Sequence, residues 1–110
     1  MRRLILAALP LLAGCMPYPP PPAAPYHAVG VDSRWDLVID DRNITFIAAG
    51  QQPVVQRKPR VIVGFAGEIY QTPRINVNIV HGSCVTANRT YSDRVQVYVD
   101  GVQHEGCGGL

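Results

Sequence analysis

Short runs of alternating apolar and polar residues fill most of the chain from Arg34 onward, with turn residues between them. Successive side chains of a β-strand point to opposite faces, so alternation predicts strands that place one face on a core. The apolar positions of the clearest runs are Trp35, Leu37, Ile39, Ile44, Phe46, Ala48, Ile75, Val77, Ile79, Val95, Val97 and Val99. No stretch is convincing as a helix. The pattern therefore predicts an all-β domain, a small antiparallel barrel or sandwich of six to seven strands.

Turn residues indicate how some of these strands are joined. The polar cluster at residues 40–43 separates the first two runs, which predicts a hairpin over residues 35–48. Asp100 and Gly101 form a strong signal for a two-residue turn before Val102. We therefore expect hairpins near both ends of the domain.

Two further strands are predicted in the middle of the chain. Residues 54–56 lie between Pro53 and Pro59, which suits a short edge strand because proline cannot donate to a ladder. Residues 61–66 are nearly all apolar, as in a strand covered on both faces, and Gly64 within them predicts a bulge or bend.

The N-terminus has the features of an export signal. Arg2 and Arg3 precede an apolar run over residues 4–12, which is too short for a transmembrane helix of about 20 residues. The Leu-Ala-Gly-Cys sequence at 12–15 resembles the cleavage and lipidation box of bacterial lipoproteins. This resemblance implies a lipid on Cys15. The alternative is an ordinary signal peptide cut elsewhere, with Cys15 an incidental thiol.

The export interpretation divides the chain into a signal peptide (1–14), a lipidated Cys15 with a proline-rich spacer (15–30) and a β domain (31–110). The prolines of residues 18–25 exclude a helix and favour an extended polyproline II spacer. A proline-rich ligand for a partner protein is the alternative. The residue after Cys15 is Met16 and not an aspartate, which resembles lipoproteins that are sorted by default to the outer membrane. We therefore expect the domain at its periplasmic face, with the inner membrane less favoured.

Charge argues against nucleic acid as a partner. The chain has ten Lys and Arg against eight Asp and Glu, a net charge of +2. Arg2 and Arg3 account for the excess, so the exported domain would be neutral, without a basic field for nucleic acid. The expected partners are the membrane, through the lipid, and a protein of the envelope.

Cys84 and Cys107 are the two cysteines that remain after Cys15. Disulfides persist in exported proteins, so we predict a bridge between them. His81 and His104 each stand three residues before a cysteine, and the four residues are an alternative zinc site with two nitrogens and two thiolates. Because thiolates tend to be lost to a disulfide in an oxidising compartment, the bridge is favoured and no cofactor is predicted.

The sequence carries no recognisable catalytic set. Ser83 and Ser92 lack the Gly-x-Ser-x-Gly context of a nucleophile elbow. A thiol nucleophile would need a free cysteine beside a base. Asp36, Asp40 and Asp41 are more simply interpreted as solvated side chains. We therefore predict a protein that is not an enzyme.

Parts of residues 30–109 resemble a group of bacterial envelope proteins of unknown role. In that group a tryptophan opens the first strand, and a later cysteine leads through an Asp-Arg-x-Tyr segment to a strand, a glycine turn and a Gly-Cys pair. The matching residues are Trp35, Cys84, Asn88, Arg89, Thr90, Tyr91, Asp100, Gly101, Gly106 and Cys107. Residues 32–34 replace the group's Glu-Pro-Phe, and its Asp-Gly-Met-Ser run is absent. The resemblance implies an envelope location and no specific activity.

Residues 86–92 are more loosely similar to a loop of the membrane-bound inhibitors of C-type lysozyme, which are small periplasmic lipoproteins with a β-barrel and a disulfide. Those inhibitors insert a Ser-Gly-x-x-Tyr loop into the lysozyme cleft, whereas the Ser-Gly pair is absent here. This similarity implies a protein binder in the envelope.

We therefore expect a lipid-anchored, non-enzymatic envelope lipoprotein with a structural, protective or binding role in the periplasm. The alternatives are a lysozyme-inhibitor-like binder and a metal or small-ligand binder at His81, Cys84, His104 and Cys107. Arg and Tyr are common at binding hot spots, so a contact surface is predicted over residues 88–93 and the polar strand face that follows. Its residues are Arg89, Tyr91, Asp93, Arg94, Gln96 and Tyr98. Alternatively, Tyr91 and Tyr98 pack on the barrel and Arg89 pairs with Asp93.

Overall fold

The computed structural model describes residues 24–109, so the predicted signal peptide, Cys15 and most of the spacer lie outside the described residues. Within residues 24–109 the chain forms nine β-strands and no helix. The strands are β1 (Tyr26–Gly30), β2 (Trp35–Ile39), β3 (Asn43–Ala48), β4 (Val54–Arg57), β5 (Ile62–Val63), β6 (Gly67–Gln71), β7 (Ile75–Val85), β8 (Thr90–Val99) and β9 (Val102–Gly108). Accordingly, this part of the chain has no helix long and apolar enough to cross a membrane.

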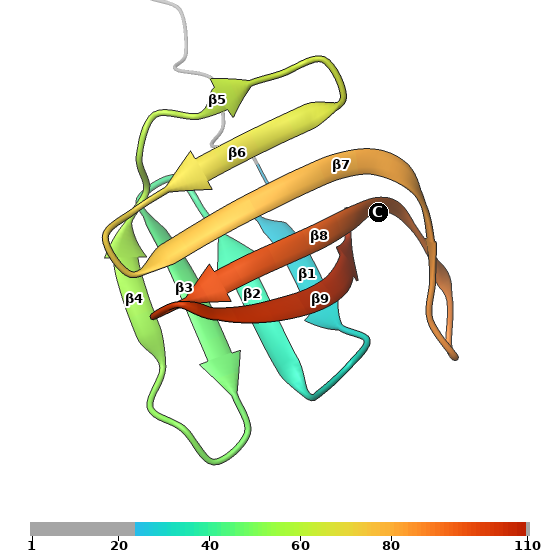
Figure 1. Cartoon of the computed structure of the whole chain (residues 1–110), viewed down its shortest axis with the longest axis horizontal. Helices are drawn as coiled ribbons and strands as arrows, with labels where there is room; N and C mark the ends of the chain where they lie inside the picture. The colour runs from blue at the N-terminus through green and yellow to red at the C-terminus, as the bar shows by residue number, and fades with distance from the viewer. Residues whose placement is uncertain (1–23, 110) are drawn as a thin grey trace, which may run out of the picture.

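All nine strands belong to one antiparallel sheet in the order β4-β3-β2-β1-β9-β8-β7-β6-β5. The sheet consists of two meanders that meet where the first and last strands pair, with Ala28 opposite Gly108. It curls over into a half-barrel, so that β2, β3 and β4 face β6, β7 and β8 across the interior (Figure 1). The strands β4 and β5 are left as the two edges.

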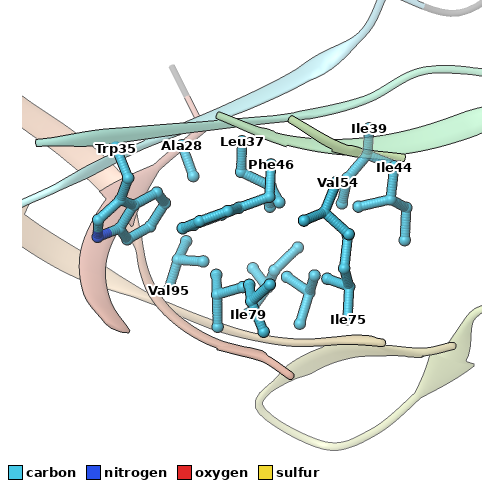
Figure 2. Close-up of a cluster of buried hydrophobic side chains, with 13 residues drawn as sticks. Ala28, Trp35, Leu37, Ile39, Ile44, Phe46, Val54, Ile75, Ile79 and Val95 are labelled. Atoms are coloured by element: carbon cyan, nitrogen blue, oxygen red, sulfur yellow. The ribbon is translucent and has the colours of Figure 1, made fainter. Parts of the chain in front are cut away.

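The predicted alternation is confirmed, because its apolar positions fill the space between the two halves of the sheet. Leu37, Phe46 and Ile44 come from the first meander, and Ile75 and Val95 come from the second (Figure 2). All five side chains are at most 2% exposed. At about 25 cal/mol per Å² of apolar surface removed from water, this burial is the main favourable contribution to folding.

The two predicted hairpin turns are also present. The carboxylate of Asp40 accepts hydrogen bonds from the backbone N–H groups of Arg42 and Asn43, at 2.8 and 2.7 Å, which closes the turn between β2 and β3. Asp100 and Gly101 have φ values of 49° and 85°, so both lie in the left-handed region that a type I′ turn requires. Short-range turn chemistry therefore sets the register of both hairpins.

The predicted count of six to seven strands is too low, because β1 and β6 carry weak sequence signals. Residues 26–30, assigned above to the spacer, form β1 between β2 and β9. Residues 67–71 form β6, which no predicted strand covered. The predicted edge strand at 54–56 is β4, extended to Arg57.

The prediction of a strand covered on both faces over residues 61–66 is wrong. Only Ile62 and Val63 are paired, on one side, with β6. Val63 and Phe65 are 73% and 109% exposed, and the N–H of Gly64 donates to the carbonyl of Gly67 at 2.8 Å in a tight turn. The apolar run therefore forms the outer strand and tip of the β5–β6 hairpin, at an edge of the sheet.

Candidate functional site

Four polar side chains from four different strands lie at one end of the core. Along β8 the inward positions Val97 and Val95 are followed by Asp93, which is 5% exposed. Asp93 lies opposite His81 of β7, and β9 between β8 and β1 places Gly108 opposite Asp93. Tyr26 of β1 and Glu68 of β6 complete the group, which we call the polar end cluster.

Three hydrogen bonds connect the polar end cluster in a row. The hydroxyl of Tyr26 donates to Oδ2 of Asp93 at 2.8 Å. Nδ1 of His81 lies 2.7 Å from Oδ1 of Asp93, and its Nε2 lies 2.8 Å from Oε2 of Glu68. The row therefore links β1, β8, β7 and β6 through side chains as well as through the sheet.

Tyr26 can reach Asp93 because the strand between them carries a glycine. A Cβ at Gly108 would lie 2.5 Å from the hydroxyl oxygen of Tyr26 and 2.9 Å from Cγ2 of Val95. Both distances are shorter than real Cβ contacts allow. Gly108 thus provides the passage through which the phenol crosses β9.

The electrostatics of the polar end cluster favour a cationic imidazole between two carboxylates. Hydrogen bonds to Asp93 and then to Glu68 raise the pKa of His81 above 6.5. Burial, followed by the hydrogen bond to Asp93, raises the pKa of Tyr26. Because each ring nitrogen of His81 faces a carboxylate, neither is free to act as a base toward a nucleophile. The cluster is therefore built to hold strands together.

We expect the stability of the domain to depend on pH through His81. The folded state holds the imidazole proton more tightly than the unfolded state, so the contribution of His81 is complete below pH 6.5 and is lost as pH rises through the raised pKa. Urea denaturation from about pH 6 to about pH 9 should show this decline. In His81→Asn the decline should be absent. An equal decline in the variant would contradict the assignment.

A second feature, a hollow of about 420 Å³, lies beside the start of β1. It is lined by Pro25, Tyr26, His27, Val29, Arg89, Tyr91 and Gly109. Arg89 and Tyr91 come from the distal part of the β7–β8 hairpin, and the guanidinium of Arg89 lies 5.3 Å from the centroid of the Tyr91 ring. We call this feature the β1 hollow. It combines apolar lining with one cation.

The predicted disulfide between Cys84 and Cys107 is present, and it holds the distal part of the β7–β8 hairpin against β9. Cys84 lies within β7, which continues past the alternating positions Ile75, Val77 and Ile79 after a register shift between His81 and Cys84. Cys107 is fully buried. The bridge therefore fixes the hairpin that carries Arg89 and Tyr91.

The zinc alternative does not fit this geometry, because both sulfurs are joined to each other. His81 belongs to the polar end cluster, whereas His104 is half-buried, with its ring centroid 4.9 Å from that of Phe46. Across residues 24–109, no group of three His, Cys, Asp or Glu side chains is placed to hold a metal ion.

The predicted contact residues are separated by the fold. Arg89 and Tyr91 line the β1 hollow, but Asp93 is buried in the polar end cluster and is unavailable to a partner. Arg94 and Tyr98 project from β8 away from the core and do not line the hollow. The segment predicted as a loop, residues 88–93, is partly strand, because β8 begins at Thr90.

The β1 side of the hollow and two members of the polar end cluster, Tyr26 and Glu68, are not predicted from the sequence. Tyr26 falls within the predicted spacer, and Glu68 lies in β6, for which the sequence predicts no strand. One signal was available for Tyr26, since Tyr26, Ala28 and Gly30 alternate with His27 and Val29. The polar end cluster itself has no local signal, because Tyr26 and Asp93 are 67 residues apart.

Comparison of the chain with protein-family models, with curated proteins and with solved structures finds no match.

Proposed function

We propose that this chain is a lipid-anchored, non-enzymatic lipoprotein of the outer membrane that binds a protein partner in the periplasm through the β1 hollow. The observation that carries the proposal is the hollow itself, in which Arg89 and Tyr91 are held beside β1 by a disulfide-stapled hairpin. The lipidation box at Cys15 supports the membrane anchor and the envelope location, and the proline-rich segment supports a spacer between the lipid and the domain. The alternative within this proposal is a structural or protective role in the envelope, without a specific protein partner.

The chemistry of the β1 hollow suits a side chain of another protein. Arg and aromatic residues contribute most strongly at binding hot spots. Arg89 makes no ion pair with any residue between 24 and 109, so its charge is available to a carboxylate. Tyr91, His27 and Val29 provide apolar and aromatic surface beside it. An acidic or aromatic side chain of a partner matches this lining.

Preorganisation of the hairpin also supports a binding role. The hydroxyl of Thr86 accepts hydrogen bonds from the N–H groups of Asn88 and Arg89, at 3.2 and 3.1 Å, and donates to the carbonyl of Arg89. Together with the bridge at Cys84, these bonds fix the turn that positions Arg89. A rigid binding segment loses less conformational entropy on association.

Capture of the partner from cross-linked envelopes tests the proposed function. We expect Arg89→Ala to reduce recovery of the partner about tenfold, because loss of about 1.4 kcal/mol of binding free energy weakens affinity tenfold. Arg74→Ala is the matched control, because Arg74 pairs with Asp100 at 2.8 Å and does not line the hollow. Equal recovery with wild type and Arg89→Ala would exclude the β1 hollow as the binding site.

Lysozyme inhibition is a second candidate function, favoured by the position of residues 86–92. This segment, whose similarity to the inhibitor loop is described above, forms the turn between β7 and β8 (86–89) and the first residues of β8, on the hairpin that the disulfide holds. Such a fixed, projecting loop suits insertion into an enzyme cleft. The test is lysis of cell walls by several C-type lysozymes with purified protein in excess. Undiminished lysis would remove this candidate.

A further inference from the structure

The β5–β6 hairpin presents apolar side chains to solvent that the fold does not use. Ile62, Val63 and Phe65 are 49%, 73% and 109% exposed, and none belongs to the core. Isolated exposed apolar residues are ordinary, whereas three within four residues at the end of a hairpin are a candidate interaction site. We call residues 62–66 the apolar tip. In Figure 1 this hairpin lies at the top of the view, at the edge of the sheet.

The apolar tip lies at the end of the domain where the chain enters from the N-terminal side. Val63 is opposite Glu68 in the β5–β6 ladder. Glu68 is joined through His81 and Asp93 to Tyr26, the first residue of β1, by three hydrogen bonds of 2.7 to 2.8 Å. The polar end cluster therefore connects the apolar tip to the point where the spacer is attached.

The length of the chain between the lipid and β1 keeps the domain close to the bilayer. Residues 16–25 are all that separates Cys15 from Tyr26. Even a fully extended chain reaches at most about 3.6 Å per residue, so about 40 Å is the upper limit of this separation. A short tether raises the effective concentration of the tip at the membrane surface.

Three basic residues precede the apolar tip in the sequence and could contact an anionic membrane surface. Arg57, Lys58 and Arg60 precede β5 in the sequence. Arg57 and Lys58 line a hollow that also contains Asp41, and Glu68, opposite Val63, is paired with His81. Arg57 and Arg60 are exposed. Basic residues next to the membrane are attracted to anionic headgroups, while Phe and aliphatic side chains enter the boundary between headgroups and acyl chains.

We propose that the apolar tip inserts into the headgroup boundary of an anionic bilayer, with Arg57, Lys58 and Arg60 on the headgroups. The domain then lies against the membrane in one orientation instead of extending from its tether. This inference relies on the proposed lipid anchor for proximity, and it adds a second contact with the same bilayer. It assigns a role to exposed apolar side chains that contribute nothing to the core.

Quenching of tryptophan by brominated phosphatidylglycerol in vesicles tests the inference. The full lipidated chain has one tryptophan, Trp35, which is buried and serves as the internal reference. Phe65→Trp adds a second at the apolar tip, where full exposure leaves room for the larger ring. We expect the emission of the added tryptophan to be lost in brominated vesicles. Val102→Trp, an exposed position beside the Asp100-Gly101 turn, should keep its emission.

The outcomes separate the anchor from the tip. Flotation of the lipidated chain with vesicles reports the anchor, and quenching at position 65 reports the tip. Flotation with unquenched emission at position 65 overturns the tip inference alone, whereas failure to float overturns both. Emission at position 65 that shifts with protein concentration without vesicles would assign the tip to a second copy and overturn the inference. Replacing Arg57, Lys58 and Arg60 with Gln should weaken the quenching.

Discussion

Replacing Phe46 with alanine is expected to lower the free energy of unfolding by about 3 to 5 kcal/mol. Phe46 is 2% exposed and lies between the two halves of the curled sheet (Figure 2). Its ring centroid is 5.6 Å from that of Trp35 and 4.9 Å from that of His104. Truncation therefore removes transfer free energy and leaves a cavity that neighbouring strands, fixed by their ladders, can fill only in part. Urea denaturation followed by far-UV circular dichroism measures the loss.

The chain contains its own matched control, because its only other phenylalanine is Phe65. Phe65 is fully exposed on the apolar tip, so Phe65→Ala should change the free energy of unfolding by no more than about 0.5 kcal/mol. The same chemical truncation thus separates a core position from a surface position. Similar losses at positions 46 and 65 would contradict the placement of the core.

Loss of the disulfide is expected to cost about 3 kcal/mol. The bridge joins residues 23 apart, and a closed loop of that length restricts the unfolded chain by about this amount in the chain-entropy model. A domain of fewer than a hundred residues buries only about 60% of its unfolded surface and has little stability in reserve. The double variant Cys84→Ala, Cys107→Ala should therefore melt roughly 12 to 24 °C lower.

Two comparisons separate the bridge from the side chains that form it. Reduction of the wild-type protein should lower its melting temperature to nearly that of the double variant, and should leave the variant unchanged. Since Cys107 is fully buried, alanine is the suitable replacement, because serine would bury an unpaired hydroxyl. A reductant that leaves the wild-type melting temperature unaltered would show that the sulfurs are not joined.

The sheet was predictable wherever one face of a strand is apolar and the other polar. The alternation at Ile75, Val77 and Ile79, and again in β8, reported the buried face correctly. It failed for β6, whose positions opposite the core-facing Ile79 and Val77 are Glu68 and Tyr70. A strand at the end of a core can turn polar side chains inward, and the binary pattern then disappears.

The apolar run at residues 61–66 shows the opposite failure. A continuous apolar run ordinarily indicates a strand buried on both faces. Here Ile62 and Val63 lie at a sheet edge and Phe65 lies in the turn. The apolar run is therefore exposed on a projecting hairpin. A single sequence does not distinguish these two cases, because both produce the same composition.

The candidate site was predictable only in its covalent part. The count of cysteines, together with the prediction that the chain is exported, was enough to pair Cys84 with Cys107. The polar end cluster depends on the pairing of β1 with β9, which brings Tyr26 beside a strand that starts more than sixty residues later. The sequence therefore predicts Asp93 as an exposed contact residue, whereas the structure buries it beside Tyr26 and His81.

The lipid on Cys15 is the central element of the proposed function and of the membrane contact inferred from the structure. Mass spectrometry of the protein recovered from separated envelope and cytosolic fractions tests it most directly. We predict a chain that begins at Cys15, carries acyl groups and is found with the envelope. Recovery of unmodified Cys15 from the cytosolic fraction would contradict the anchor and the location together.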